Sequence, residues 1–160
     1  FHGGLLGVCL ATYIFTQKNN LNFLRYTDLV SLTAPIGIFL GRVANFINSE
    51  LYGRETDFIF SVNFNKVDNL FRHPSQLYES FFEGIVLFII LNFLWKKFSD
   101  IPGVISSLFL IFYSLFRFII EFTREPDAHL GTLMNIFTYG QMLSIAFFIA
   151  GLILFKLVKK

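Results

Sequence analysis

The chain has 160 residues, of which 54% are hydrophobic, 15% are charged and 23 are phenylalanine, and its mean hydropathy is +0.61. Soluble domains carry about 25% charged residues, so the composition excludes a protein that faces water on all sides. The formal charge of +2 comes without a basic run, which argues against nucleic-acid binding. A single cysteine, Cys9, excludes an internal disulfide and a thiolate-rich metal site.

Five apolar stretches, separated by charged residues, are long enough or nearly long enough to cross a bilayer core of about 30 Å. The alternating segments of about ten residues that a β-barrel needs are absent from the sequence. The pattern therefore predicts an all-α polytopic membrane protein with about five transmembrane helices. The predicted spans are Leu5–Gln17, Leu29–Ile47, Leu77–Trp95, Val104–Phe122 and Phe137–Leu157.

We expect residues 1–160 to form a single transmembrane domain. Because the chain starts at Phe1 without a methionine or a signal-peptide start, we expect a fragment that lacks its N-terminal helices. The loops are short except the second, residues 48–75, which is polar enough to form a small extracytoplasmic head. Its FIFSVNF segment alternates weakly, as in a short strand pair.

The lysines indicate the orientation in the membrane. Six of the seven lie at one set of helix ends, and only Lys66 lies at the other. By the positive-inside rule those ends are cytoplasmic, so the second loop faces outward. The six lysines are Lys18, Lys96, Lys97, Lys156, Lys159 and Lys160.

Two polar stripes fall near the outer ends of the predicted spans. They are spaced by three or four residues, so each lies on one helix face. The first comprises Arg42, Asn45 and Asn48, and the second Tyr113, Arg117, Glu121 and Arg124. Two intramembrane arginines beside one acid leave positive charge unbalanced. Either Arg117 pairs with Glu121 while Arg42 reaches the interface, or both arginines bind an anion, for which a lipid phosphate fits the arginine fork.

Two histidines leave alternatives open. His2, before a glycine pair, is either structural or a general base, because histidine takes a proton near neutral pH. His73 before Pro74 indicates a helix start, with Gln76 and Tyr78 as candidate head-group contacts. The sequence contains no HExxH zinc motif, no phosphate loop ending in GK[ST], no GxSxG elbow and no pair of aspartates in mid-membrane.

The segment GRVANFINSELYG, residues 41–53, resembles the signature G-R-x-[GA]-N-F-x-N-x-E-x-x-G of the bacterial phosphatidylglycerol–prolipoprotein diacylglyceryl transferase family. Three further blocks resemble that family in the same order: HGGL at residues 2–5, HPSQLYE at 73–79 and RFIIEFTREPD at 117–127. The resemblance covers essentially the whole chain, and the family's N-terminal part is missing from it.

The resemblance implies a transferase of the inner membrane with its active site on the periplasmic side. Such enzymes move the diacylglyceryl group of phosphatidylglycerol to the lipobox cysteine of a preprolipoprotein, forming a thioether and releasing glycerol phosphate. They need no metal and no cofactor. His2, Arg42 and Arg117 are then expected to be catalytic. The expected substrate-binding residues are Arg42, Asn45, Asn48, Glu50, Gly53, Gln76, Tyr113, Glu121 and Arg124.

The alternative function is an anion or lipid transporter, or a flippase, with an arginine-lined path. Transporters of this kind often contain internal repeats and a binding site at the middle of the membrane. The sequence has no internal repeat, and its polar residues cluster near one end of the spans. The pattern therefore favours the transferase, with phosphatidylglycerol, the lipobox segment and the bilayer as partners.

Overall fold

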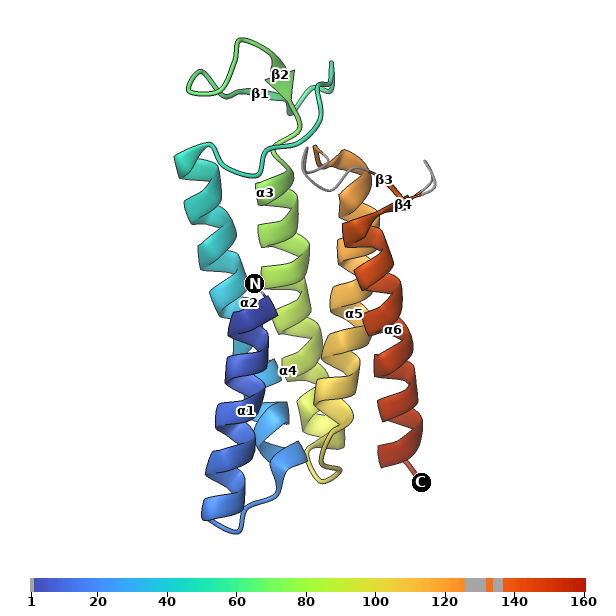
Figure 1. The fold of residues 1–160 in the computed structure, drawn as a ribbon. Coiled ribbons are helices and arrows are strands. Elements are labelled where there is room, and N and C mark those ends of the chain that lie inside the picture. The colour runs from blue at the N-terminus through green and yellow to red at the C-terminus, as the bar shows by residue number, and fades with distance from the viewer. Residues whose placement is uncertain (1, 126–131, 134–136) are drawn as a thin grey trace.

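The computed structural model describes residues 2–125, 132–133 and 137–160, without the side chains of His2, Leu5, Thr132 and Leu133. It is a bundle of helices that run roughly along one axis (Figure 1). The helices are α1 (His2–Lys18), α2 (Phe23–Asn48), α3 (Ser75–Glu79), the π-helix η1 (Ser80–Val86), α4 (Leu87–Phe98), α5 (Val104–Ile120), the 3-10 helix η2 (Glu121–Thr123) and α6 (Tyr139–Val158).

Four of the described helical segments are long and apolar enough to cross a membrane: Phe23–Asn48, Ser75–Phe98, Val104–Thr123 and Tyr139–Val158. They confirm the predicted all-α polytopic class. The first predicted span corresponds to α1, which has 17 residues and is not one of the four. At about 1.5 Å per residue it is roughly 25 Å long, so the predicted count of five is not confirmed.

The segment between α2 and α3 lies beyond the ends of the helices (Figure 1). It contains strands β1 (Val62–Asn63) and β2 (Phe71–Arg72), which pair antiparallel with Val62 opposite Arg72. The strand predicted within FIFSVNF is thus present at its end, and its partner lies nine residues further along. A second short pair joins β3 (Thr132–Leu133) to β4 (Phe137–Thr138) just before α6.

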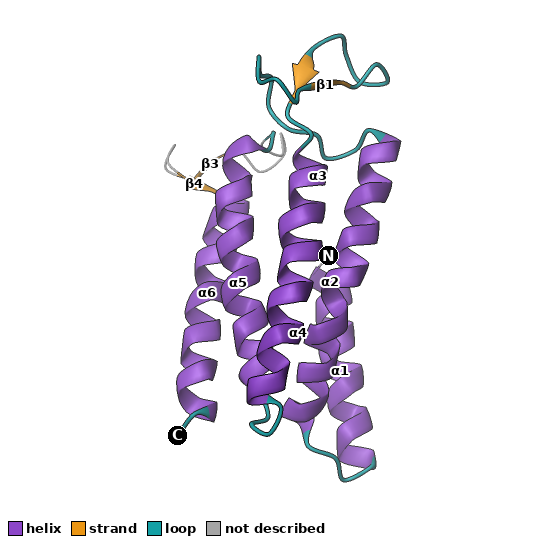
Figure 2. Ribbon diagram, turned by 180° about the vertical axis from the view of Figure 1, so that it is seen from behind, coloured by secondary structure: helices purple, strands orange, loops and turns teal. Residues whose placement is uncertain are grey.

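Close helix contacts depend on two glycines. A Cβ on Gly84 would lie 2.7 Å from the Cβ of Phe39, so η1 can approach α2 only because this side chain is missing. A Cβ on Gly151 would lie 2.9 Å from Cγ1 of Ile111, where α6 packs along α5. Seen from behind, α2 and α4 lie side by side (Figure 2). The apolar core of Leu87, Leu91 and Ile105 lies between α4 and α5.

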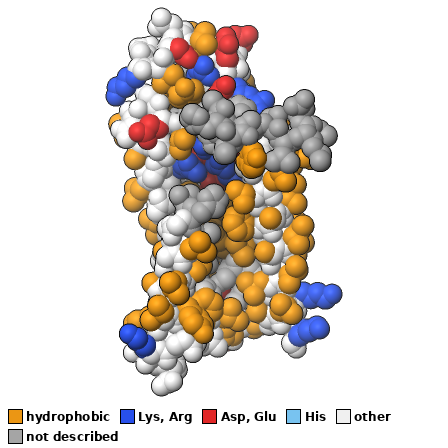
Figure 3. All heavy atoms as spheres, in the orientation of Figure 1, with side chains coloured by type: hydrophobic (Ala, Val, Ile, Leu, Met, Phe, Trp, Pro, Cys, Tyr) orange, Lys and Arg blue, Asp and Glu red, His pale blue; other side chains and the backbone are white. Residues whose placement is uncertain are grey.

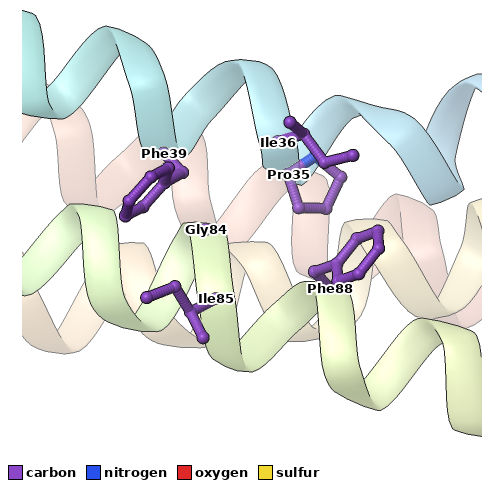
Figure 4. A pocket seen from close by; sticks show the side chains of 6 residues that line it. All are labelled: Pro35, Ile36, Phe39, Gly84, Ile85 and Phe88. Atoms are coloured by element: carbon purple, nitrogen blue, oxygen red, sulfur yellow. The ribbon is translucent and has the colours of Figure 1, made fainter.

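Residues of α2, η1 and α4 also line a shallow, open hollow of about 170 Å³ whose lining is entirely apolar (Figure 4). The lining residues are Pro35, Ile36, Phe39, Gly84, Ile85 and Phe88. The charged residues described below are not part of this lining.

At the end of the bundle where α2 and α5 begin, a buried carboxylate connects α2 to the start of α5. Asp28 is fully buried, and its side chain accepts hydrogen bonds from the backbone N–H groups of Gly103 and Ser106, both at 2.7 Å. The hydroxyl of Ser106 donates to the same carboxylate at 2.7 Å. The first N–H groups of a helix have no partner within the helix, so Asp28 caps α5 from 75 residues away in the sequence.

Candidate active site

Two helices and the segment that follows η2 bring arginines to one buried carboxylate. Glu79, the last residue of α3, is fully buried. Its Oε2 lies 2.9 Å from Nε of Arg42 on α2, and its Oε1 accepts a hydrogen bond from Nη1 of Arg117 on α5. The same Oε1 accepts a hydrogen bond of 3.1 Å from Arg124, just beyond η2. A single glutamate therefore connects the arginines of three separate elements.

Arg117 is held by two further carboxylates. Its Nη1 lies 3.6 Å from Glu83 on η1, and its Nη2 lies 3.0 Å from Glu121, one helical turn away. Glu121 is held in turn by the hydroxyl of Thr138, which donates to it at 2.9 Å. Gly140 leaves the room for this carboxylate, because a Cβ there would lie 2.6 Å from its carboxyl carbon. The guanidinium plane of Arg117 is thus fixed from two sides.

The π-helix lies at the centre of this arrangement. Single turns of π-helix within α-helices are rare and occur frequently at functional sites. Here η1 follows Glu79 directly and contains Glu83, so both carboxylates face the arginines of α2 and α5. Its glycine, Gly84, allows the close approach to α2 that brings Arg42 within reach of Glu79.

The predicted excess of positive charge is wrong for the described residues. Three guanidinium groups meet three carboxylates, and the formal charges balance: Arg42, Arg117 and Arg124 against Glu79, Glu83 and Glu121. Glu79 and Glu83 were not predicted as site residues, although two acids four residues apart in an apolar span were a visible signal. Figure 3 shows acidic side chains together with basic ones on the upper part of one face of the molecule, while further basic side chains lie at its lower end. The three arginines and three glutamates together are called the arginine–glutamate cluster below: Arg42, Arg117, Arg124, Glu79, Glu83 and Glu121.

The signature residues that follow Arg42 build the loop above the cluster. The side-chain amide of Asn45 donates to the carboxylate of Glu50 at 3.1 Å, across the left-handed C-cap at Ser49. Gln76 is buried and donates to the backbone carbonyl of Glu50 at 2.6 Å. Asn48 is the last residue of α2 and is exposed. Asn45, Glu50 and Gln76 are therefore brought together, while Asn48 points to the outside of the bundle.

Gly53 sits where two other segments touch the loop. Its N–H donates to the carbonyl of His73 at 2.9 Å, and it forms an isolated β-bridge with Arg124. A Cβ at this position would lie 2.5 Å from the carbonyl oxygen of His73 and 2.6 Å from that of Thr123. Arg54 adds a hydrogen bond of 2.9 Å from its Nε to the carbonyl of Arg124. Only glycine permits this closure over the cluster.

The segment between α2 and α3 has two ion pairs of its own, both made by Arg72. Arg72 contacts Asp68 at 2.8 Å and Glu125 at 3.3 Å, and its guanidinium lies over the ring of Tyr52. The hydrogen bonds from Arg72 lower the pKa of Asp68, and those bonds in turn raise the pKa of Arg72. The Arg72–Asp68 pair closes the β1–β2 loop, and the Arg72–Glu125 pair connects this loop to the residues that follow η2.

The side chains of His73 and Tyr78 contact each other. The sequence predicted His73 at a helix start and Tyr78 as a head-group contact. Nδ1 of His73 lies 3.4 Å from the hydroxyl of Tyr78. Partial burial lowers the pKa of His73. The predicted helix start is confirmed, because α3 begins at Ser75 directly after Pro74. Both side chains therefore lie where the loop between α2 and α3 joins α3.

Tyr113 lies against the apolar core of the bundle. Tyr113 stacks on Phe109, with ring centroids 5.6 Å apart, and packs against the Leu87–Ile105 core. The backbone of His2 opens α1, but its side chain lies outside the described part of the structure. The predicted role of His2 as a base stays a prediction.

Residues 1–157 match the family model described as prolipoprotein diacylglyceryl transferase. The phosphatidylglycerol–prolipoprotein diacylglyceryl transferase of Rickettsia felis is 51% identical over 153 residues, which are 94% of this chain and 59% of that protein. Its counterpart in Rickettsia bellii is 52% identical over 156 residues, or 96% and 59%. The chain thus spans 59% of the length of these relatives, and it belongs to the prolipoprotein diacylglyceryl transferase family.

Proposed function

We propose that the protein transfers the diacylglyceryl group of phosphatidylglycerol to the lipobox cysteine thiol of preprolipoproteins. The sulfur attacks the glyceryl carbon, a thioether forms, and the carbon–oxygen bond to phosphate breaks, which releases glycerol phosphate. The observation that carries the proposal is the meeting of Arg42 and Arg117 at Glu79, within a segment long and apolar enough to cross a membrane. The relatives' names identify the two substrates of those proteins.

The arginines suit the leaving group. A phosphate that departs gains negative charge, and fixed guanidinium groups stabilise it without reorganising. The carboxylates of Glu79 and Glu121 hold Arg117 in one orientation before the lipid arrives. Asn45, Glu50 and Gln76, which are linked to one another, are proposed to shape the entrance above the phosphate. The protein substrate supplies the nucleophile, so Cys9, which is exposed on α1, is not required.

A base near the attacking sulfur helps, because a thiol with a pKa of about 8.5 is mostly protonated at neutral pH. We propose His2 for this role. The full-length enzyme should then gain activity as pH rises through about 6 to 7. In His2→Gln, this rise should disappear and the remaining rate should follow the fraction of substrate thiolate. An active His2→Gln enzyme with an unchanged pH profile would exclude the base role.

The whole proposal is tested by incubating the full-length protein with phosphatidylglycerol and a lipobox peptide. We expect the peptide to gain the mass of one diacylglyceryl unit, and a peptide with serine in place of the cysteine to gain nothing. The same protein in vesicles distinguishes the transporter alternative. Movement of phosphatidylglycerol between leaflets, without any change in the peptide's mass, would favour a flippase. The proposed location is the bacterial inner membrane, with the arginine–glutamate cluster toward the periplasm.

A further inference from the structure

One carboxylate of the arginine–glutamate cluster differs from the other two. Glu83 is fully buried, and neither of its carboxylate oxygens accepts a hydrogen bond from any described residue. Its nearest cation is Nη1 of Arg117 at 3.6 Å. Glu79, by contrast, contacts three arginines, and Glu121 contacts Arg117 at 3.0 Å and the hydroxyl of Thr138 at 2.9 Å. Glu83 is the least satisfied acid of the cluster.

Charged and titratable groups face Glu83 from each neighbouring element. Arg42 lies on α2, Glu79 on α3, and both Arg117 and Tyr113 on α5. With all three acids ionised, the three arginines of the cluster are already neutralised. A phosphodiester anion entering the cluster would add one negative charge to a buried, balanced site. Such a charge is costly unless it is compensated.

We propose that Glu83 takes up one proton when a phospholipid phosphate binds to Arg42 and Arg117. The proton restores the charge balance and releases Arg117 from its weakest carboxylate contact, so the donors of the guanidinium that Glu79 and Glu121 do not occupy become available to the phosphate. Glu79 and Glu121 keep their arginine contacts and hold the fork in place. This inference rests on the proposed function insofar as it places the lipid phosphate at these two arginines.

The proton uptake is measured by isothermal titration calorimetry of phosphatidylglycerol into the full-length protein in detergent. Titrations in two buffers with different ionisation enthalpies give the number of protons bound per lipid. We expect about one proton to be taken up per lipid bound. Because binding then consumes a proton, the Kd should rise as the pH rises, by up to tenfold per pH unit in the range where one full proton is taken up. Glu83→Gln mimics the protonated acid. It should bind the lipid as tightly as the unmodified protein does at low pH, without uptake and without pH dependence.

Two variants serve as controls. Glu83→Asp retains a carboxyl group and should retain the uptake. Glu121→Gln already lacks one negative charge of the cluster, so its lipid binding should take up less than one proton. Lipid binding by the unmodified protein without proton uptake would overturn the inference. So would uptake that persists in Glu83→Gln, which would assign the proton to another group such as His2. A folded Glu83→Gln protein that does not bind the lipid would also contradict it.

Failure of the proposed function gives a different result. If phosphatidylglycerol binds with uptake at Glu83 but no thioether forms on the lipobox peptide, the inference stands and the transferase proposal fails. If the thioether forms and binding takes up no proton, the transferase proposal stands and the inference fails.

Discussion

Arg117 offers a sharp residue-scale test, because its two terminal nitrogens contact different carboxylates. A lysine keeps the charge but has no planar fork, so it cannot hold both Glu79 and Glu121 while binding a phosphate. We expect Arg117→Lys to lose activity in the full-length enzyme, by about tenfold for each 1.4 kcal/mol of transition-state contact removed. The peptide mass-shift assay measures this loss.

Arg25 provides the matched control for that substitution. It lies in the first turns of α2, at the far end from Arg42, and its guanidinium lies over the ring of Trp95. Arg25→Lys should therefore leave the transfer rate close to normal. Equal rates for Arg117→Lys, Arg25→Lys and the unmodified enzyme would mean that Arg117 acts only as a diffuse charge.

We expect His73 to make the loop between α2 and α3 sensitive to pH. Burial lowers its pKa from the ordinary value of 6.5, so below pH 6.5 the unfolded loop binds the proton more readily than the folded one. The free energy of opening should therefore fall as the pH falls through 6.5 toward the folded pKa. Hydrogen exchange of residues 50–72, corrected for intrinsic rates, should show this fall between pH 7.5 and 5.5.

The fall in the free energy of loop opening at low pH should be absent in His73→Gln and present in Asp68→Asn. The pKa of Asp68 is lowered from 3.8 by Arg72, so its stabilising contribution is complete above 3.8 and is lost only as the pH falls through its lower, folded pKa. A fall of the same size in His73→Gln would assign the sensitivity to another group.

At the scale of elements, the contact between α2 and η1 decides whether Arg42 meets Glu79. A Cβ on Gly84 would lie 2.7 Å from Cβ and 3.0 Å from Cα of Phe39, and a backbone cannot easily yield. We expect Gly84→Ala to destabilise the protein by about 1–3 kcal/mol, as overpacking does, and to reduce activity further by separating the two helices. Thermal unfolding in detergent measures the first effect.

Gly37→Ala is the control on the same helix pair. Nothing lies within 4 Å of a Cβ at Gly37, and alanine favours a helix by up to about 1 kcal/mol over glycine. This variant should be as stable as the unmodified protein or more so. If Gly84→Ala unfolds at the same temperature as Gly37→Ala, the close approach of η1 to α2 is not required.

The helices themselves could be predicted from the sequence, because long apolar runs leave no other way to satisfy backbone groups in lipid. Their ends were less accurate: α2 begins at Phe23 and not at Leu29. The cap of α5 by Asp28 could not be predicted, since it joins residues 75 apart. The π-helix left no pattern in the hydropathy, although it orients Glu83.

The site was predicted only in part, because spacing in the sequence identifies contacts within one helix. Spacing along one helix identified Arg42 with Asn45 and Arg117 with Glu121, and the i,i+4 pair of Arg117 and Glu121 is present at 3.0 Å. Contacts between helices need a packing that spacing does not contain. Glu79 was therefore missed, although it joins α3 to α2 and α5.

At the scale of the whole molecule, the two ends of the bundle differ in charge, and this difference predicts its orientation. Lysines end α1, α4 and α6 at one end, while the β1–β2 loop and the arginine–glutamate cluster lie toward the other (Figure 1). The positive-inside rule assigns the lysine end to the cytoplasm. Two exposed turn positions, Asn69 between the strands and Asp100 after α4, report the two sides.

Cysteine labelling in intact spheroplasts measures this orientation. Because Cys9 is exposed, the variants are made in a Cys9→Ser background, which should not react with the reagent. A membrane-impermeant thiol reagent applied from outside should label Asn69→Cys and leave Asp100→Cys unlabelled until the membrane is opened. The cluster would then face the outer leaflet, where a lipobox cysteine arrives after export. Labelling of Asp100→Cys alone would invert the topology, and a periplasmic transfer reaction at Arg42 and Arg117 would no longer be tenable.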